Sequence, residues 1–335
     1  MRILTPAGPR EYRSVWMDGQ KVRMIDQRLL PETFQIVDFE EVEEVAHAIK
    51  DMTVRGAPAI GVAAAYGMAL AAINGRDLSE AAWLLKRQRP TAFDLFFAVD
   101  HMLARIGRGD DPIRTANEYC DSIVNRCRMI GENGSRLIDT GDRLMTHCNA
   151  GALATVDYGT ALSPIRMAWR AGKEVFVYVS ETRPRLQGMK LTAFELVNEG
   201  IPHRIIVDSA SGHFMRLGVD MVIVGADRIA ANGDFANKIG TFEKAVLAKE
   251  LGIPFYVAAP ISTFDLSLRD GEGIVIEERG EEEVNELEGK RLAPKGSRAL
   301  NPSFDITPCK YVTGYITEMG VLRPQDVQKV RGDME

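Results

Sequence analysis

The chain has 335 residues, of which 45% are hydrophobic, and its formal net charge is −6. This length exceeds what one ordinary core supports and predicts two domains, which we place at residues 1–128 and 129–335. The composition is typical of a globular protein, and the negative charge argues against broad binding to nucleic acid or to a membrane surface. No apolar run reaches the roughly 18 residues that a membrane span requires.

The cysteines and histidines indicate neither a disulfide framework nor a metal site. None of the four cysteines forms a C-x-x-C pair, and the five histidines show no metal-ligand spacing. The opening segment MRILTPAGPREY lacks the apolar core of a signal peptide. We therefore expect a cytoplasmic protein with reduced thiols and no structural metal.

The first 128 residues predict a mostly helical domain with a short antiparallel sheet. Residues 12–38 suggest short strands, and Asp18-Gly19 lies between two half-apolar runs as a hairpin signal. From about Val42 to Arg128, apolar residues recur at three- and four-residue steps, as in VEEVAHAIKDM and AFDLFFAVDHMLARI. The segment AIGVAAAYGMALAA is apolar almost all round and predicts a buried helix.

From about Asp142, apolar runs of strand length alternate with helical stretches. The strand candidates are RLMTHC, EVFVYVS, HRIIVD, DMVIVGAD and PFYVAA, and the helices between them are YGTALSPIRMAWRAG, LTAFELVNEG and TFEKAVLAKELG. This alternation predicts an α/β fold with a Rossmann-like parallel sheet covered on both faces. Ligands of such sheets bind beyond the carboxyl ends of the strands, where we expect Cys148, Glu181, Asp208 and Asp227.

The acidic segment EERGEEEVNELEG, residues 277–289, follows these elements. It is interpreted as a solvated loop or a short helix, because runs of charge usually face water.

Two arginine-bearing segments are candidate anion sites. Arg55-Gly56-Ala57-Pro58 opens the buried helix, whose first N–H groups and positive dipole end attract anions. Arg89-Pro90-Thr91 repeats the arrangement before another helix. The alternative in both cases is an ordinary helix start with a surface arginine.

Cys148 and Asp227 are the candidate catalytic groups. Cys148 ends an apolar strand and is followed by Asn149-Ala150-Gly151, whose backbone N–H groups would lower the pKa of the thiol. Asp227 follows MVIVGA, and burial there would favour a neutral carboxyl that acts as a general acid. The alternatives are a buried core cysteine and a helix cap. We expect His147 to pack elsewhere, because neighbours on a strand point to opposite faces.

Asn237 and Lys238 precede a predicted helix and are candidate contacts for a phosphate or hydroxyl, although a surface lysine remains the alternative. The chain lacks the G-x-G-x-x-G, G-x-x-x-x-G-K-[ST] and G-x-S-x-G motifs. We therefore predict no dinucleotide, no nucleoside triphosphate and no serine hydrolase activity.

Taken together, six segments resemble the methylthioribose-1-phosphate isomerases, a branch of the superfamily that includes the regulatory subunits of translation initiation factor 2B. They are RGAPAIG at Arg55, RPTAFDL at Arg89, THCNAGALAT at Thr146, ETRPRLQG at Glu181, GADRIAANGDFANKIGT at Gly225 and NPSFDITP at Asn301. The resemblance extends from Trp16 to about Leu322.

The resemblance implies an aldose–ketose isomerase of methionine salvage that converts 5-methylthioribose 1-phosphate to 5-methylthioribulose 1-phosphate. It implies a homodimer that binds a small sugar phosphate and needs no cofactor. It also implies catalysis by Cys148 and Asp227. The implied substrate contacts are Arg55, Gly56, Ala57, Arg89, Gln187, Asn237 and Lys238.

The chain departs from the family pattern at residues 156–158, 163–165 and 205–215, which we expect near the pocket and which concern the 5-substituent of the sugar. Two alternatives are the same chemistry on ribose 1,5-bisphosphate or on 5-deoxyribose 1-phosphate. A third is a non-catalytic subunit like those of initiation factor 2B. The sequence leaves open whether hydrogen moves as a hydride or through an enediol.

Overall fold

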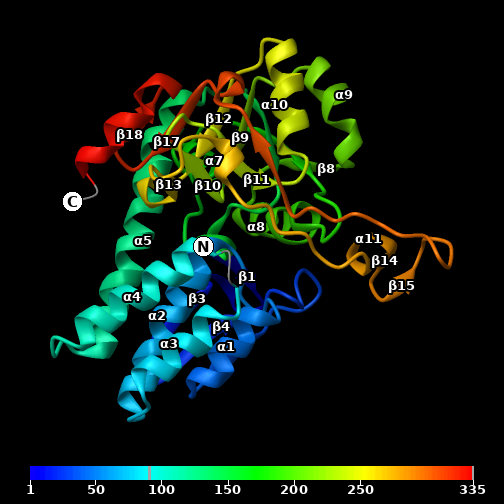
Figure 1. The fold of residues 1–335 in the computed structure, drawn as a ribbon. Coiled ribbons are helices and arrows are strands. Elements are labelled where there is room, and N and C mark those ends of the chain that lie inside the picture. The colour runs from blue at the N-terminus through cyan, green and yellow to red at the C-terminus, as the bar shows by residue number, and fades with distance from the viewer. Residues whose placement is uncertain (90–91, 334–335) are drawn as a thin grey trace.

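The computed structural model describes residues 1–89 and 92–333, which form two parts joined by a long helix (Figure 1). The N-terminal part, blue to cyan in the figure, lies below the larger C-terminal part. Helix α5 (Pro112–Gly134) packs on the helices of the first part and on helix α7 (Leu162–Arg170) of the second. The proposed domain boundary at residue 128 falls inside this helix and stays a prediction.

The N-terminal part begins with short antiparallel strands. The predicted hairpin is confirmed: Asp18 pairs with Lys21, and Gly19 takes a φ of +61° in the turn. A further strand joins the hairpin to make a three-stranded sheet, and a separate two-stranded ribbon precedes it. The strands are β1 (Arg2–Thr5), β2 (Gly8–Glu11), β3 (Val15–Asp18), β4 (Lys21–Ile25) and β5 (Ile36–Phe39).

Helix α2 (Ala57–Ile73) forms the centre of the N-terminal core. Every residue from Ala59 to Ala71 is buried, which confirms the prediction of a helix apolar on all sides. The helices that surround it are α1 (Val42–Lys50), α3 (Leu78–Lys86), α4 (Phe93–Ile106) and α5. The N-terminus of α2 also packs closely on the segment at Ala154, which belongs to the C-terminal part.

A seven-stranded sheet, parallel apart from one edge strand, organises the C-terminal part. Its strands are β6 (Arg143–His147), β7 (Phe176–Ser180), β8 (His203–Ile206), β9 (Met221–Val224), β12 (Phe255–Ala258), β17 (Gly314–Thr317) and β18 (Gly320–Leu322), of which only β18 is antiparallel. Their spatial order is β18-β17-β12-β9-β6-β7-β8. This is the Rossmann order, and its direction of winding reverses between β6 and β9. The α/β fold predicted from the sequence is confirmed.

Helices cover this sheet, and one of them starts later than expected. They are α6 (Ala152–Thr155), α7, α8 (Ala193–Glu199), α9 (Ser211–Arg216) and α10 (Thr241–Glu250), with a π-helical turn at Gly188–Thr192 before α8. The predicted helix from Tyr158 was wrong in its first four residues. Tyr158 and Gly159 have φ values of +61° and +91°, which an α-helix cannot contain, so α7 begins at Leu162.

A second sheet of four strands, in the order β13-β10-β11-β16, lies beside the first and was not predicted. Its strands are β10 (Arg228–Ala230), β11 (Phe235–Lys238), β13 (Phe264–Asp265) and β16 (Phe304–Thr307). The remaining elements are α11 (Glu282–Asn285), β14 (Glu286–Leu287), β15 (Lys290–Arg291) and short 3-10 turns at Ser135–Leu137, Asp208–Ala210, Ile261–Thr263, Gly271–Gly273, Cys309–Tyr311 and Pro324–Asp333. Within the described residues, no helix is long and apolar enough to cross a membrane.

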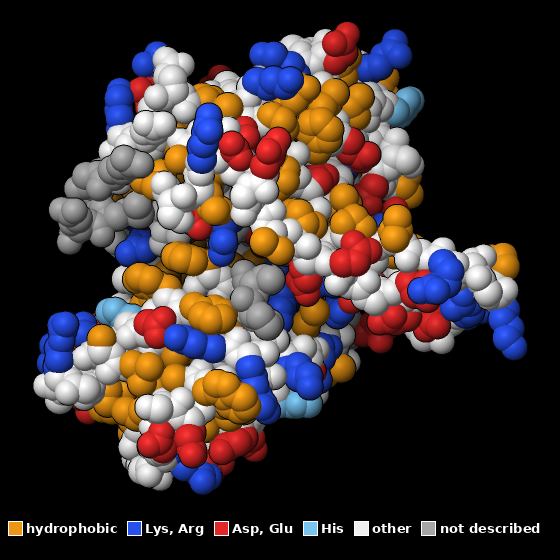
Figure 2. All heavy atoms as spheres, in the orientation of Figure 1, with side chains coloured by type: hydrophobic (Ala, Val, Ile, Leu, Met, Phe, Trp, Pro, Cys, Tyr) orange, Lys and Arg blue, Asp and Glu red, His pale blue; other side chains and the backbone are white. Residues whose placement is uncertain are grey.

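The arm formed by α11, β14 and β15 projects from the body of the molecule (Figures 1 and 2). On the face that Figure 2 shows, the arm carries both acidic and basic side chains. The expected short helix is α11, but the acidic segment 277–289 is only partly solvated, because six of its 13 residues are exposed, six are half-buried and Asn285 is buried. Hydrophobic side chains gather on this face where the two parts of the molecule meet.

Candidate active site

A cavity of about 120 Å³ lies at the carboxyl ends of β6 and β9, where the winding of the sheet reverses. Ligands of doubly wound sheets bind at such a point. The N-terminus of α2 closes it from the other part of the molecule, and strand β11 contributes a further wall. All nine predicted site residues line this cavity: Arg55, Gly56, Ala57, Arg89, Cys148, Gln187, Asp227, Asn237 and Lys238.

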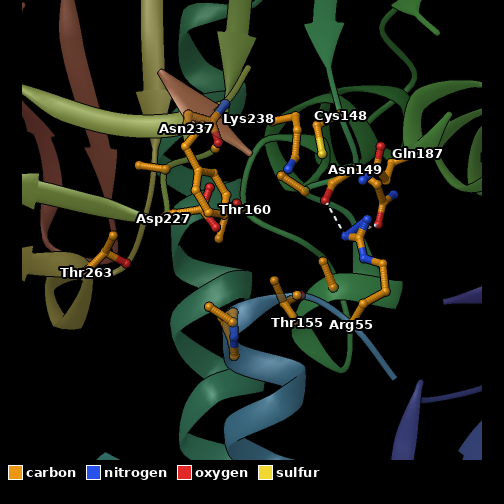
Figure 3. Close-up of a pocket in the computed structure, with 18 of the residues that line it drawn as sticks. Arg55, Cys148, Asn149, Thr155, Thr160, Gln187, Asp227, Asn237, Lys238 and Thr263 are labelled. Atoms are coloured by element: carbon orange, nitrogen blue, oxygen red, sulfur yellow. Dashed lines mark hydrogen bonds between the residues drawn. The ribbon is translucent and has the colours of Figure 1, made fainter. Parts of the chain in front are cut away.

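Cys148 and Asp227 face the cavity from opposite sides (Figure 3). Cys148 follows β6 directly, and its backbone is left-handed with a φ of +63°. For a residue with a Cβ this conformation costs about 1–2 kcal/mol, so neighbouring contacts must hold it. The Cys148 amide donates to Thr182 Oγ1 at 2.8 Å, and its carbonyl accepts from Thr192 Oγ1 at 2.6 Å.

Asp227 follows β9, and its amide donates to the carbonyl of Ala236. Burial raises the pKa of the Asp227 carboxyl above its usual range, although the positive charges of Lys238, Arg55 and Arg89 oppose this effect. A carboxyl with a raised pKa keeps its proton to higher pH. The predicted general acid therefore has a physical basis in its surroundings.

Arg55 is held by the loop that carries the cysteine. Its Nη2 donates to the backbone carbonyl of Asn149 at 2.8 Å and to Asn149 Oδ1 at 3.1 Å (Figure 3). The next residue, Gly56, caps α2 with a φ of +96°, and a Cβ there would lie 2.4 Å from the carbonyl oxygen of Ala154. Glycine is required at this position because α2 approaches α6 so closely.

Glu195 accepts hydrogen bonds from the loop that follows Cys148, residues 149–153. This fully buried carboxylate accepts from Asn149 Nδ2 at 2.9 Å, from the amide of Ala152 at 2.8 Å and from that of Leu153 at 3.2 Å. Arg166, also buried, neutralises it through Nη2 at 2.9 Å. Loss of either Arg166 or Glu195 would leave the other as an unpaired buried charge, so the ion pair strongly favours this conformation of the loop.

Lys238 and Asn237 lie at the end of strand β11 and are buried, so neither is a surface residue. The Lys238 ammonium donates to the carbonyl of Ser303 at 2.7 Å and lies 4.4 Å from the centre of the Phe304 ring. Burial lowers the pKa of Lys238. Asn237 Nδ2 donates to Thr241 Oγ1 at 2.9 Å.

Gln187 and Arg89 complete the predicted set. No hydrogen-bond partner lies near the buried Gln187 Oε1 in the part of the chain that the structure describes. Burial lowers the pKa of Arg89, but a guanidinium stays charged in proteins. Pro90 and Thr91 of the same motif lie outside the described residues.

A second, larger chamber of about 540 Å³ adjoins the first and shares Gly56, Ala57, Arg89, Asp94, Asp227 and Phe304 with it. Its remaining wall is largely apolar. The apolar side chains come from α2, the start of α4, strand β11 and the loop after β13, and they are Ile60, Ala92, Phe93, Phe96, Ala236, Ile274 and Val275. Arg228 is the charged side chain among the described residues that line this chamber alone. The site as a whole therefore pairs a small polar cavity with an apolar chamber.

A family model described as the initiation factor 2 subunit family matches residues 53–324. The chain belongs to this family. Two relatives named methylthioribose-1-phosphate isomerase are close in sequence. That of Roseiflexus castenholzii is 50% identical over 96% of this chain and 97% of its own length. The isomerase of Thermotoga maritima is 49% identical over 95% of this chain and 96% of its own length.

Two crystal structures share the fold over nearly the whole chain. The 5-methylthioribose 1-phosphate isomerase of Pyrococcus horikoshii is 42% identical over 97% of both chains, with a TM-score of 0.91. A protein described as the delta subunit of translation initiation factor eIF-2B, from A. fulgidus, is 43% identical over 96% of this chain and 99% of its own, with a TM-score of 0.88. The family resemblance inferred from the motifs is confirmed.

Not every polar residue at the strand ends belongs to the site of this initiation factor 2 family member. Glu181 and Asp208 do follow β7 and β8, but neither lines the cavity. Asp208 instead accepts from the amides of Thr182 and Arg183 at 2.9 and 2.7 Å, and so shapes the loop after β7. The reason is the sheet order, because only β6 and β9 flank the switch point.

His147 only partly fits the expectation that it packs elsewhere. Its ring touches the cavity wall, yet it is buried, with Nε2 2.8 Å from the carbonyl oxygen of Ile239 and Nδ1 3.3 Å from Thr182 Oγ1. Burial lowers its pKa to about 3, so the imidazole is neutral. Its nitrogens are therefore occupied by structural contacts.

Two charged residues at the site were not predicted from the sequence. Arg279 lines the cavity, although it belongs to the acidic segment that was expected to be solvated; its Nη2 lies 3.3 Å from Glu277 Oε2. Asp94, in the first turn of α4, lines both chambers, and burial raises its pKa to about 6. Arg279 carried no sequence signal, whereas Asp94 lay within the quoted motif RPTAFDL.

The three segments that depart from the family pattern, residues 156–158, 163–165 and 205–215, line neither chamber. In the first of them, Asp157 Oδ1 lies 2.6 Å from the N-terminal ammonium of Met1. The expectation that these segments lie beside the pocket and bear on the 5-substituent is therefore not supported by the lining. Asp157 of segment 156–158 instead forms an ion pair with the first residue of the chain.

Proposed function

We propose that the chain is an aldose–ketose isomerase that converts 5-methylthioribose 1-phosphate to 5-methylthioribulose 1-phosphate, a step of methionine salvage. The observation that carries the proposal is that a cysteine thiol and a carboxyl with a raised pKa face one cavity lined by positive charges. The names of relatives near 50% identity support the same reaction.

The substrate phosphate sits against the cationic residues of the cavity. Arg55, Arg89 and Lys238 supply the charge, and the first N–H groups of α2 add donors at its positive end. The hydrogen bonds from Arg55 to Asn149 fix the direction of the guanidinium before substrate binds. Gln187 and Asn237 contact sugar hydroxyls, a role that the unpaired Gln187 Oε1 supports. A phosphate held in this way positions the reacting carbons.

Asp227 acts as the general acid that opens the sugar ring. The phosphate on the anomeric oxygen locks the ring, so the bond from C1 to the ring oxygen must break in the site. Neutral Asp227 donates its proton to the ring oxygen as that bond breaks. The raised pKa keeps this proton on the carboxyl nearer to neutral pH.

Cys148 assists the transfer of hydrogen from C2 to C1. In the hydride route it accepts the proton of the C2 hydroxyl, and in the enediol route it removes the proton from C2. In the hydride route the substrate gains one proton at the ring oxygen and loses one from the C2 hydroxyl. In the enediol route C1 must also gain a proton and the C2 hydroxyl must also lose one before the ketose forms, so two protons are gained and two are lost. Deuterium placed at C2 separates them, because a hydride shift retains it at C1.

The apolar chamber supports a 5-methylthio group over a 5-phosphate. Its wall contains Ile60, Phe93, Phe96, Ile274 and Val275, which are suited to an uncharged substituent. The Asp94 carboxyl lies at the junction of the two chambers, where its charge would oppose a second phosphate. The Arg228 guanidinium also lines the larger chamber, but it is paired with Asp265 at 3.6 Å. This supports the methylthio or 5-deoxy sugar over ribose 1,5-bisphosphate.

The protein acts as a homodimer in the cytoplasm. The exposed sheet edge supports the dimer: β8 is an edge strand, and Ile205 and Val207 are 42% and 54% exposed on and beside it. Exposed apolar edge strands favour pairing with another chain. The four cysteines are free, which supports a reducing compartment. Light scattering of the purified chain tests the dimer.

The function is tested by assaying the purified chain alone on the three sugar phosphates. We expect the largest kcat/KM with 5-methylthioribose 1-phosphate and the smallest with ribose 1,5-bisphosphate. Turnover of none of the three, together with binding to initiation factor 2B subunits, would assign the chain to the non-catalytic branch instead.

A further inference from the structure

The backbone of Cys148 is tied on both sides by threonine hydroxyls. Its amide donates to Thr182 Oγ1 at 2.8 Å, and its carbonyl accepts from Thr192 Oγ1 at 2.6 Å. Both threonines are completely buried, and Cys148 itself has a φ of +63°. A residue in the left-handed region keeps that conformation only where its surroundings impose it.

Thr182 is itself held in place by the loop after β7. Its own φ is +68°, and its amide donates to Asp208 Oδ1 at 2.9 Å. Gly188 packs so closely against this loop that a Cβ there would lie 1.8 Å from the Ser180 carbonyl oxygen and 3.0 Å from Thr182 Oγ1. The hydroxyl that meets the Cys148 amide is therefore rigidly placed.

Thr192 connects the cysteine to the anion-binding arginine. It ends the π-helical turn before α8, and its hydroxyl donates to Cys148 O and accepts from Asn149 Nδ2 at 3.2 Å. Asn149 in turn accepts from Arg55. One threonine thus orders both the residue that carries the thiol and the residue that directs the guanidinium.

We propose that Thr182 and Thr192 are positioning residues that hold Cys148 in its left-handed conformation and so aim its thiol at the substrate. This rests on the proposed function of Cys148. The physical reason is that the Cα–Cβ direction follows from φ and ψ. Without the two hydroxyls the strained residue relaxes toward a negative φ, and the sulfur turns away from the reacting carbons.

The test replaces each threonine with valine, which keeps the shape and removes the hydroxyl. We expect Thr182→Val and Thr192→Val each to lower kcat at least tenfold, and Thr182→Val to leave KM within threefold. Thr182→Ser and Thr192→Ser restore the hydroxyl and should return kcat to within threefold of the wild type. Rescue by serine separates a hydrogen bond from mere packing.

Thr307→Val is the matched control, because Thr307 is equally buried, lies on β16 outside both chambers, and its hydroxyl has no partner among the described residues. Its kcat should stay within twofold of the wild type. The proposal is overturned if both valine variants keep kcat within threefold, if serine does not rescue, or if Thr307→Val loses as much.

Two further comparisons between variants cover a folding failure and separate the role of the thiol from that of the threonines. If Thr182→Val does not fold, as judged by circular dichroism, Thr192→Val and Thr192→Ser still test the hydrogen bond to the Cys148 carbonyl, and unchanged kcat in Thr192→Val then overturns the proposal. Cys148→Ser separates the two proposals. Full activity in that variant overturns the role of the thiol, whereas inactive Cys148→Ser with active valine variants overturns only the positioning role.

Discussion

The two sides of the cavity are built by different physical means. On the Cys148 side, hydrogen bonds fix positions: threonine hydroxyls tie the cysteine backbone, and Glu195 accepts from three groups of the same loop and from Arg166. On the Asp227 side, burial shifts the balance between the charged and neutral forms of a carboxyl. The first side depends on geometry, and the second on the exclusion of water.

This difference predicts how each side responds to change. Hydrogen-bond geometry hardly varies with pH near neutrality, so the fold-loss of kcat in Thr182→Val or Thr192→Val should be similar at every pH. A carboxyl with a raised pKa loses its proton at a higher pH than an ordinary carboxyl, so we expect the Asp227 side to set the alkaline limb of the pH profile. The following experiments test that distinction, beginning with the largest effect.

Replacing Asp227 with Asn removes the proton donor and keeps the shape of the side chain. We expect kcat to fall by about 10²–10⁴-fold. In the wild type, kcat/KM should fall as the pH rises through the raised pKa of Asp227, because only the protonated form donates. The residual activity of the variant should lack this alkaline decline, as measured by steady-state assays across pH. An unchanged profile would contradict the role of Asp227.

Replacing Cys148 with Ser exchanges the thiol for a hydroxyl that gives up its proton far less readily. We expect kcat again to fall by about 10²–10⁴-fold, with the wild-type fold retained by circular dichroism. Unlike the Asp227 variant, this one should keep the alkaline decline. Activity near that of the wild type would refute the assignment.

Replacing Arg55 with Lys retains the charge and removes the planar group that meets both acceptors of Asn149. We expect KM for the sugar phosphate to rise about tenfold, which is the scale of one charge-assisted hydrogen bond. Lys86→Arg is a suitable control, because Lys86 pairs with Asp100 outside both chambers. An unchanged KM would show that the phosphate binds elsewhere.

Replacing Asp94 with Asn tests whether water is excluded from the Asp94 carboxyl, and the measured quantity is the free energy of unfolding. The folded-state pKa of about 6 exceeds the ordinary 3.8, so Asp94 favours folding below about pH 4, and this contribution is lost as the pH rises to about 6. At pH 8 the charged carboxylate is unfavourable in the folded state. Asp94→Asn should therefore raise stability at pH 8 by up to about 3 kcal/mol, and less where water enters the chamber.

Urea unfolding at pH 4 and pH 8 measures the Asp94 effect. The gain from Asp94→Asn should be larger at pH 8 than at pH 4. Equal gains at both pH values would mean that Asp94 is hydrated in the folded protein.

Most of the candidate site could be predicted because it lies where chain patterns change. Cys148 and Asp227 each end an apolar run, and parallel strands bring such ends to one edge of a sheet. The arginine of RGAP precedes a helix that is apolar on every side, which placed its N-terminus inside the protein. Both features are visible in the sequence because hydrophobic periodicity and the end of an apolar run depend only on neighbouring residues.

The remaining features depend on contacts between distant segments. Four polar residues were expected at the strand ends, but only the order of the strands decided that Cys148 and Asp227 meet while Glu181 and Asp208 do not. Arg279 reaches the cavity from a segment whose composition indicates solvent exposure. The left-handed φ of Cys148 has no sequence signature, because threonines 34 and 44 positions away impose it.

The sequence by itself determined the class of fold, the buried helix and the strand ends from which the chemistry comes, because hydrophobic periodicity is a local property. Only the tertiary structure decided which ends share a cavity, which carboxyls keep a proton and which backbone is held under strain. Strand order, burial and long-range hydrogen bonds set these, and each depends on residues far apart in the chain.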